Sequence, residues 1–145
     1  MRSAKQAEAA KFDAAFFADG PALADNIRYS SRFRLEPLTT IAALAAVSTH
    51  IGFIATASTT YNEPYNLARL FALADHIGGG RTGWNIVTTS QPTAAANFGL
   101  DHHPLHAQRY ARAPDFLEVV TKLWDSWEEG ALRFDKAWAS SRKPT

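Results

Sequence analysis

Residues 51–90, IGFIATASTTYNEPYNLARLFALADHIGGGRTGWNIVTTS, decide the fold because their pattern is that of one strand–helix–strand unit. Residues 51–57 and 83–87 are apolar runs of strand length. Asn62 is the expected N-cap of the intervening helix. The glycines at 78–80 are expected to end that helix, because glycine adopts the left-handed C-cap conformation without a steric penalty. Two such strands joined by a helix predict a parallel pair with a right-handed crossover.

Polar residues gather directly after each of these two strands. Residues 58–62 are STTYN and residues 88–90 are TTS. The carboxyl ends of parallel strands meet at one edge of a sheet, and binding sites of α/β folds form there. The sequence therefore predicts a polar site at this edge.

The chain before this unit contains a further strand and two helices. Residues 3–11 are alanine-rich and predict a short helix, residues 12–17 a strand, and residues 37–48 an alanine-rich helix. Asp19 follows the strand in a turn, where it is either a turn aspartate or a site residue. Residues 21–36 predict a loop that carries Arg28, Arg32 and Arg34. These arginines either belong to a solvated face or meet an anionic substrate.

The chain after this unit is dominated by one long helix. Residues 92–98 predict one or two helical turns, and residues 106–127 a long helix. Its apolar stripe, including both tryptophans, is expected to face the core: Phe116, Val119, Val120, Leu123, Trp124 and Trp127. Residues 130–145 have no apolar period and predict a tail.

Composition excludes several classes of function. The 145 residues include 15 basic and 14 acidic side chains, for a net charge of +1. This balance gives no electrostatic reason to expect a nucleic acid or an anionic membrane as partner. The chain has no cysteine, which excludes disulfides, zinc–thiolate sites and a cysteine nucleophile. The N-terminus lacks the apolar core of a signal peptide, so a cytoplasmic protein is expected.

His106 and Tyr110 are four residues apart and so share a face of the first turns of the long helix. A helix N-terminus favours anions, so the pair either holds a phosphate and lines a ring or is an ordinary surface pair. His102 and His103 lie close to His106 in sequence, but without cysteine or a well-placed carboxylate they make a poor ligand set, and no metal is expected. GGGRTG follows a helix rather than opening one, so it predicts a turn and not a phosphate loop.

Four longer stretches carry a family resemblance. ATASTTYNEPYNLARLFALADHIGGGRTGWNIVTTS at 55–90 and NFGLDHHPLHAQRYARAPDFLEVVTKLWDSW at 97–127 closely resemble the bacterial-luciferase-like flavin monooxygenases. KFDAAFFADG at 11–20 and LEPLTTIAALAAVSTHIG at 35–52 fit the same branch, that of the nitrilotriacetate monooxygenase large component, component A. The resemblance extends over about residues 5–136.

The resemblance implies a TIM (β/α)8 barrel and a two-component reaction. A separate reductase would use NAD(P)H to supply FMNH2, with which the large component oxygenates a small organic substrate, such as an aminopolycarboxylate, using O2. The resemblance assigns no catalytic residue. It does imply flavin-binding positions at strand ends and at the long helix: Asp19, Thr56, Asn85, Thr89, His106 and Tyr110.

A TIM barrel has eight strands and about 250 residues, whereas this sequence predicts about three barrel strands. We therefore expect an α/β fold that is a partial barrel: residues 1–136 as a partial luciferase-like domain and 137–145 as a divergent tail. A truncated fragment is expected to be inactive alone, while the full-length family would form homo-oligomers. The alternative is a non-catalytic remnant or interaction module that pairs through an exposed sheet edge.

Overall fold

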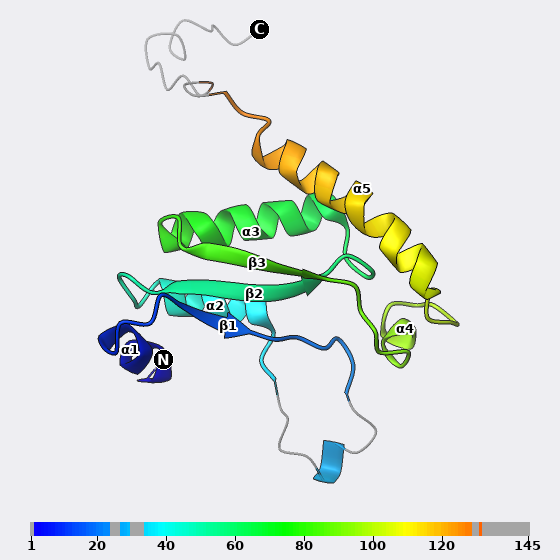
Figure 1. The fold of residues 1–145 in the computed structure, drawn as a ribbon, viewed down its shortest axis with the longest axis horizontal. Coiled ribbons are helices and arrows are strands. Elements are labelled where there is room, and N and C mark those ends of the chain that lie inside the picture. The colour runs from blue at the N-terminus through cyan, green and yellow to red at the C-terminus, as the bar shows by residue number, and fades with distance from the viewer. Residues whose placement is uncertain (1, 24–26, 30–33, 129–130, 132–145) are drawn as a thin grey trace, which may run out of the picture.

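A three-stranded, fully parallel sheet forms the centre of the molecule (Figure 1). The computed structural model describes residues 2–23, 27–29, 34–128 and 131, so Arg32 and the predicted tail at 137–145 lie outside the described residues. The strands are β1 (Ala14–Phe17), β2 (Gly52–Ser58) and β3 (Thr82–Val87), and they lie side by side in the order β1-β2-β3. The three predicted strands and their parallel pairing are confirmed.

Helices connect the strands and cover one face of the sheet. α2 (Pro37–Ala45) lies between β1 and β2 in the chain, and α3 (Pro64–Gly78) between β2 and β3. After β3 come the short α4 (Ala94–Asn97) and the long α5 (His106–Trp124), which packs along α3. The chain begins with α1 (Arg2–Ala9), and a single 3-10 turn, η1 (Ile27–Tyr29), precedes α2.

The alternation of side chains along the strands separates a core face from an open face. Phe53, Ala55 and Ala57 of β2 are buried against α2, α3 and α5, with Ile41, Phe71 and Val120 among the helix residues of this core. The neighbouring side chains, which point to the other face, are polar or partly exposed; Phe16 is 56% exposed. The open face therefore has room for a bound molecule between the strand ends.

The C-terminal end of α3 agrees with the sequence prediction, whereas its N-terminal end does not. Gly79 takes the left-handed conformation (φ 62°) as the C-cap of α3, as expected. The expected N-cap at Asn62 is wrong: Glu63 occupies that position without a side-chain hydrogen bond. The Asn62 amide instead donates to the carbonyl of Ser58 at 2.7 Å, so it closes the loop after β2 rather than capping the helix.

The expectation that the apolar stripe of the long helix, both tryptophans included, faces the core holds for only part of the stripe. Phe116 and Val120 lie in the core, but α5 ends at Trp124, and Trp127 is 64% exposed. Trp124 is 41% exposed and uses its indole N–H to bind the carbonyl of Ala68 at 2.9 Å. Within the described residues, the stripe is buried only where it lies over α3 and the sheet.

Two sets of hydrogen bonds stabilise the end of the sheet at which β2 and β3 begin. The Glu8 carboxylate of α1 accepts hydrogen bonds from the backbone N–H groups of Thr49, His50 and Ile51, just before β2. Arg81, just before β3, donates to carbonyls around the C-terminus of α2. Across the described ranges, no helix combines the length and apolarity needed to cross a membrane.

Candidate functional site

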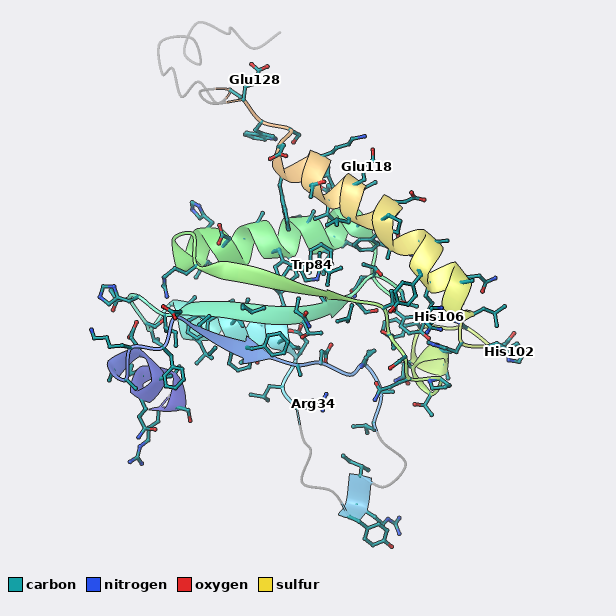
Figure 2. The ribbon with its side chains drawn as sticks, in the orientation of Figure 1. Arg34, Trp84, His102, His106, Glu118 and Glu128 are labelled. Carbon is teal, nitrogen blue, oxygen red and sulfur yellow. The ribbon has the colours of Figure 1, made fainter. Side chains whose placement is uncertain are left out.

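A cavity of about 410 Å³ lies at the carboxyl ends of all three strands, on the open face of the sheet. Four of the six predicted site residues line it: Asp19, Thr56, Asn85 and Thr89. Arg34, from the segment that leads into α2, also lines it (Figure 2). The other lining residues are Phe16, Ala18, Gly20, Pro21, Ser58, Val87, Thr88, Ser90 and Gln91.

Thr56 and Asn85 are paired across the centre of the site. They are register partners on β2 and β3. The Asn85 amide nitrogen donates to the Thr56 hydroxyl oxygen at 2.9 Å, and Thr56 is buried. Because Thr56 accepts this bond, its own hydroxyl proton can donate into the cavity, and the amide oxygen of Asn85 can accept; neither group has another partner among the described residues.

A second polar cluster joins the ends of β2 and β3. The hydroxyl oxygens of Ser58 and Thr89 lie 2.7 Å apart, and both side chains are buried. The backbone N–H of Thr89 bonds to the hydroxyls of Ser58 at 3.1 Å and Thr60 at 3.2 Å. The predicted gathering of hydroxyls at this edge is thus confirmed, and the cluster fixes how far apart the two strand ends stand.

Two hydrogen-bond acceptors of different charge line the cavity: the Asp19 carboxylate and the Gln91 amide oxygen. A carboxylate oxygen of the half-buried Asp19 accepts the N–H of Gly20 at 2.7 Å, so Asp19 shapes the turn after β1. A Cβ at Gly20 would come within 2.9 Å of the Gln91 amide oxygen, so the end of the Gln91 side chain packs directly against the turn after β1. That oxygen is itself buried without a hydrogen-bond partner among the described residues. Nothing in the sequence pattern singled out Gln91.

His106 and Tyr110 lie in the first turns of α5. Figure 2 shows His106 beside the loops at this end of the sheet. Their rings stack with centroids 4.4 Å apart and planes 25° apart, so the expected shared helix face is confirmed. Both side chains are exposed, and neither lines the cavity. Arg109 between them is buried and donates to the carbonyl of Pro104 at 2.7 Å, which ties the first turn of the helix to the preceding loop.

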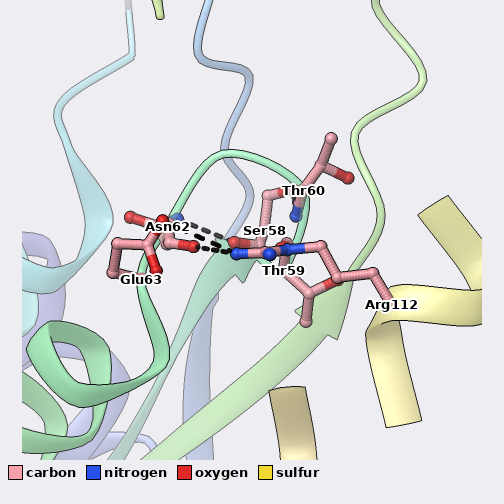
Figure 3. A network of polar contacts seen from close by, with 6 residues as sticks. All are labelled: Ser58, Thr59, Thr60, Asn62, Glu63 and Arg112. Carbon is pink, nitrogen blue, oxygen red and sulfur yellow. Dashed lines mark hydrogen bonds and ion pairs between the residues drawn. The ribbon is translucent and has the colours of Figure 1, made fainter. Parts of the chain in front are cut away.

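Arg112 docks α5 onto the loop after β2 (Figure 3). Its guanidinium donates to the carbonyl of Thr59 at 3.1 Å and to that of Asn62 at 3.0 Å, and it forms an ion pair with Glu63 at 3.7 Å. The sequence carried no signal for this contact, because the partners are about 50 residues apart. The contact sets where His106 and Tyr110 stand relative to the strand ends.

Tyr61 and His103 form a second link between these loops. The Tyr61 hydroxyl and His103 Nδ1 are 2.6 Å apart, and the Tyr61 ring stacks on Phe98. Burial raises the pKa of the Tyr61 phenol. His103 therefore belongs to a loop contact, whereas His106 stacks on Tyr110. Within the described ranges, no three His, Asp or Glu side chains are grouped so that they could hold a metal ion.

Comparisons of the sequence and of the structure with known proteins point to the same family. The model of the family described as luciferase-like monooxygenase matches residues 1–139. Nitrilotriacetate monooxygenase component A of Aminobacter aminovorans is 60% identical over 102 residues, which are 70% of this chain and 22% of that protein.

Two solved structures share the fold over nearly the whole chain. EDTA monooxygenase from Chelativorans sp. BNC1 is 41% identical with a TM-score of 0.83, over 99% of this chain and 33% of that one. A riboflavin lyase solved with modified FMN and riboflavin is 39% identical with a TM-score of 0.84, over 94% of this chain and 33% of that one. The three parallel strands correspond to part of a TIM barrel, and the chain spans at most about a third of these relatives' lengths.

Proposed function

The chain belongs to the luciferase-like monooxygenase family of flavin-dependent enzymes, and from this premise we propose that it forms part of the FMNH2 site of a two-component monooxygenase. The observation that carries the proposal is the shared cavity: Asp19, Thr56, Asn85 and Thr89 come from three different strand ends and line one space.

The polar groups of this cavity suit the heteroaromatic edge of a flavin. Such an edge presents carbonyl oxygens and ring nitrogens, which need both donors and acceptors. The Thr56 hydroxyl supplies a donor, and the amide oxygen of Asn85 supplies an acceptor. The amide oxygen of Gln91, which has no hydrogen-bond partner in the described part of the chain, is a further acceptor. Buried polar groups favour a ligand that completes their hydrogen bonds, because leaving them unpaired costs free energy.

When bound, reduced FMN would supply the reaction with O2 that oxygenates the substrate. The chain's own part is to hold the ring edge through Thr56, Asn85 and Thr89. The open face carries Phe16 and Val87 beside these groups and would shield the ring from water once covered. His106 and Tyr110 are proposed to contact the flavin phosphate and ring from the start of α5, where helix N–H groups favour anions.

The substrate is proposed to be a small organic molecule that carries carboxylates, such as an aminopolycarboxylate. Arg34 lines the cavity and brings a cation to it, and guanidinium groups recognise carboxylates well. The similarity to a nitrilotriacetate monooxygenase component agrees with this choice. A separate reductase that consumes NAD(P)H is the proposed source of FMNH2, in keeping with a relative named as one component of a system. A cytoplasmic location stays a prediction.

The alternative function, that of an interaction module, is supported by the two edges of the sheet. Among the described residues β1 and β3 each pair only with β2, and Ile86 of β3 is 42% exposed. Unpaired edges are able to accept a further strand. Homo-oligomer formation and the boundary at residue 136 likewise stay predictions.

An anaerobic titration with FMNH2 tests the proposed function. The wild-type chain should bind with saturation, and Asn85→Ala should weaken binding about tenfold, the effect of losing one or two hydrogen bonds. Asn66→Ala, on the exposed side of α3, is the matched control and should bind as wild type does. A folded wild-type chain that shows no saturable binding would contradict the proposal and favour the interaction module.

A further inference from the structure

The segment that ends α4 contacts the loops after both other strands. α4 follows β3 by way of residues 87–91, which line the cavity. The side-chain amide of Asn97 donates to the carbonyl of Pro21 at 3.0 Å, in the turn after β1. The next residue, Phe98, stacks on Tyr61 in the loop after β2, with ring centroids 4.5 Å apart. Two consecutive residues thus connect the end of α4 to both of the other strand ends.

The direction of the bond between Asn97 and Pro21 follows from the chemistry of the two groups. A backbone carbonyl oxygen can only accept, so the Asn97 atom that faces it must be the amide nitrogen. The opposite orientation of the amide would bring two acceptor oxygens together. The bond joins residues 76 positions apart, and Pro21 itself lines the cavity. Asn97 is therefore a donor to one wall of the cavity.

The helix that carries Asn97 is itself held in place. Ala94 and Ala95 are 0% and 3% exposed, so α4 is packed on the rest of the molecule. The backbone N–H of Ala94 bonds to the carbonyl of Gln91 at 3.2 Å, which connects α4 to the segment after β3. The Gln91 side chain reaches the same turn as Asn97, since a Cβ at Gly20 would lie 2.9 Å from its amide oxygen. The turn after β1 therefore has two side-chain contacts from the region that follows β3.

This turn brings Asp19 and Gly20 to the cavity. Asp19 accepts the N–H of Gly20 at 2.7 Å, but that bond lies within the turn and cannot fix its distance from the segment after β3. We propose that Asn97 is a positioning residue that holds the turn at 19–21 in the place that ligand binding requires, so that Asp19 is in position before the ligand arrives. The inference rests on the proposed function in taking this ligand to be reduced FMN.

Two substitutions of Asn97 separate hydrogen bonding from packing. Asn97→Ala removes the donor, whereas Asn97→Asp keeps the shape of the side chain but sets a carboxylate oxygen against the carbonyl of Pro21. In an anaerobic FMNH2 titration, Asn97→Ala should weaken binding about threefold and Asn97→Asp about tenfold, because fewer chains hold the turn in the binding position. A packing role would give the reverse order, since aspartate fills the same space, and that order would overturn the inference.

Thr93→Asp is the matched control for the added charge. It places a carboxylate on the same short helix, at the exposed N-cap position, where the threonine side chain makes no capping hydrogen bond. This variant should bind FMNH2 as the wild-type chain does. Equal losses in Thr93→Asp and Asn97→Asp would show that the charge alone weakens binding, and would overturn the inference.

Amide hydrogen exchange, followed by NMR, tests the inference without any ligand. The Gly20 N–H reports on the turn because it donates to Asp19. Its exchange should be about threefold faster in Asn97→Asp than in the wild-type chain, while the Gly80 N–H, which bonds to the carbonyl of Asp75 before β3, should keep its rate. Unchanged exchange at Gly20 would overturn the inference, whatever the chain binds. Failure of the wild-type chain to bind FMNH2 would count against the proposed function, and the exchange rates would then decide the role of Asn97.

Discussion

Asn85 lies directly opposite Thr56 on the neighbouring strand and donates its amide hydrogen to the Thr56 hydroxyl at 2.9 Å. The pair faces the open side of the sheet, while Trp84, one residue earlier, packs on Phe71 and Phe116 on the helix side. The pleat of β3 thus sends a core residue and a site residue to opposite faces, so the hydrophobic core holds the site residues in register.

Thr56→Val should cost about 1 kcal/mol of unfolding free energy, although the side chain keeps its shape. The substitution removes the acceptor of the Asn85 amide and buries an apolar methyl beside it. Urea denaturation measures the loss. Thr88→Val, a half-buried threonine that lines the same cavity, is the control and should change stability much less. Equal stability of Thr56→Val and wild type would mean that water replaces the lost bond.

Arg81→Ala should destabilise the fold by about 2–3 kcal/mol, because one charged group satisfies several carbonyls at once. Its guanidinium donates to the backbone oxygens of Ala45, Ser48 and Ile51 at 2.8–3.2 Å. Arg81→Lys should recover only part of the loss, since an ammonium group lacks the planar fork that reaches two sites. Denaturant unfolding of the three proteins checks the order. Full recovery by lysine would show that charge alone matters.

Glu8→Gln should remove a pH-dependent part of the stability. Hydrogen bonds from the backbone N–H groups of His50, Thr49 and Ile51 lower the pKa of Glu8 to about 2. A carboxyl whose pKa is lowered by folding stabilises the fold above its ordinary pKa, and the stabilisation is lost as pH falls toward 2. The difference in thermal midpoint between wild type and Glu8→Gln should therefore shrink as the pH is lowered from 7.

Glu118→Gln is the control for this series. A hydrogen bond from Lys122 lowers the pKa of Glu118 as well, but this pair lies on the exposed face of α5. Exposed pairs of this kind contribute little to stability, so the thermal midpoint of Glu118→Gln should follow wild type at every pH. A difference for Glu8→Gln that stays constant down to pH 2 would contradict the assigned cause.

Tyr61→Phe should make the protein less sensitive to alkali. Burial raises the pKa of the Tyr61 phenol, so the unfolded chain loses this proton at a lower pH than the folded chain. Stability must then fall as the pH rises above the ordinary tyrosine pKa of about 10. The wild-type protein should lose unfolding free energy more steeply there than Tyr61→Phe. Tyr65→Phe, at an exposed position, serves as the control, and parallel curves for wild type and Tyr61→Phe would refute the prediction.

Several features were predictable because they depend on neighbours in the sequence. The apolar runs of β2 and β3 follow from strand periodicity, and the left-handed Gly79 follows from its place after the last helical turn. The gathering of hydroxyls at one edge also followed, since parallel strands place their carboxyl ends together. Asp19, Thr56, Asn85 and Thr89 accordingly line one cavity.

Other features were not predictable because they depend on residues far apart in the chain. Asn62 looked like a helix cap, but its amide binds the carbonyl of Ser58 in the turn that leaves β2. Trp127 continues the apolar stripe of α5, yet the helix ends three residues earlier and this side chain is exposed. A periodic pattern marks which face is apolar, but only the packed neighbours decide how much of that face is covered.

The sequence by itself determined the strand–helix order, the family, and the edge of the sheet at which the polar residues gather, since these follow from local periodicity and from long matching stretches. The tertiary structure decided which polar groups meet there. It placed Ser58 against Thr89, 31 residues away, and Arg112 against Thr59, 53 residues away. A hydrogen bond requires two atoms within about 3 Å, and over such separations in the chain only the packed sheet and helices bring them that close.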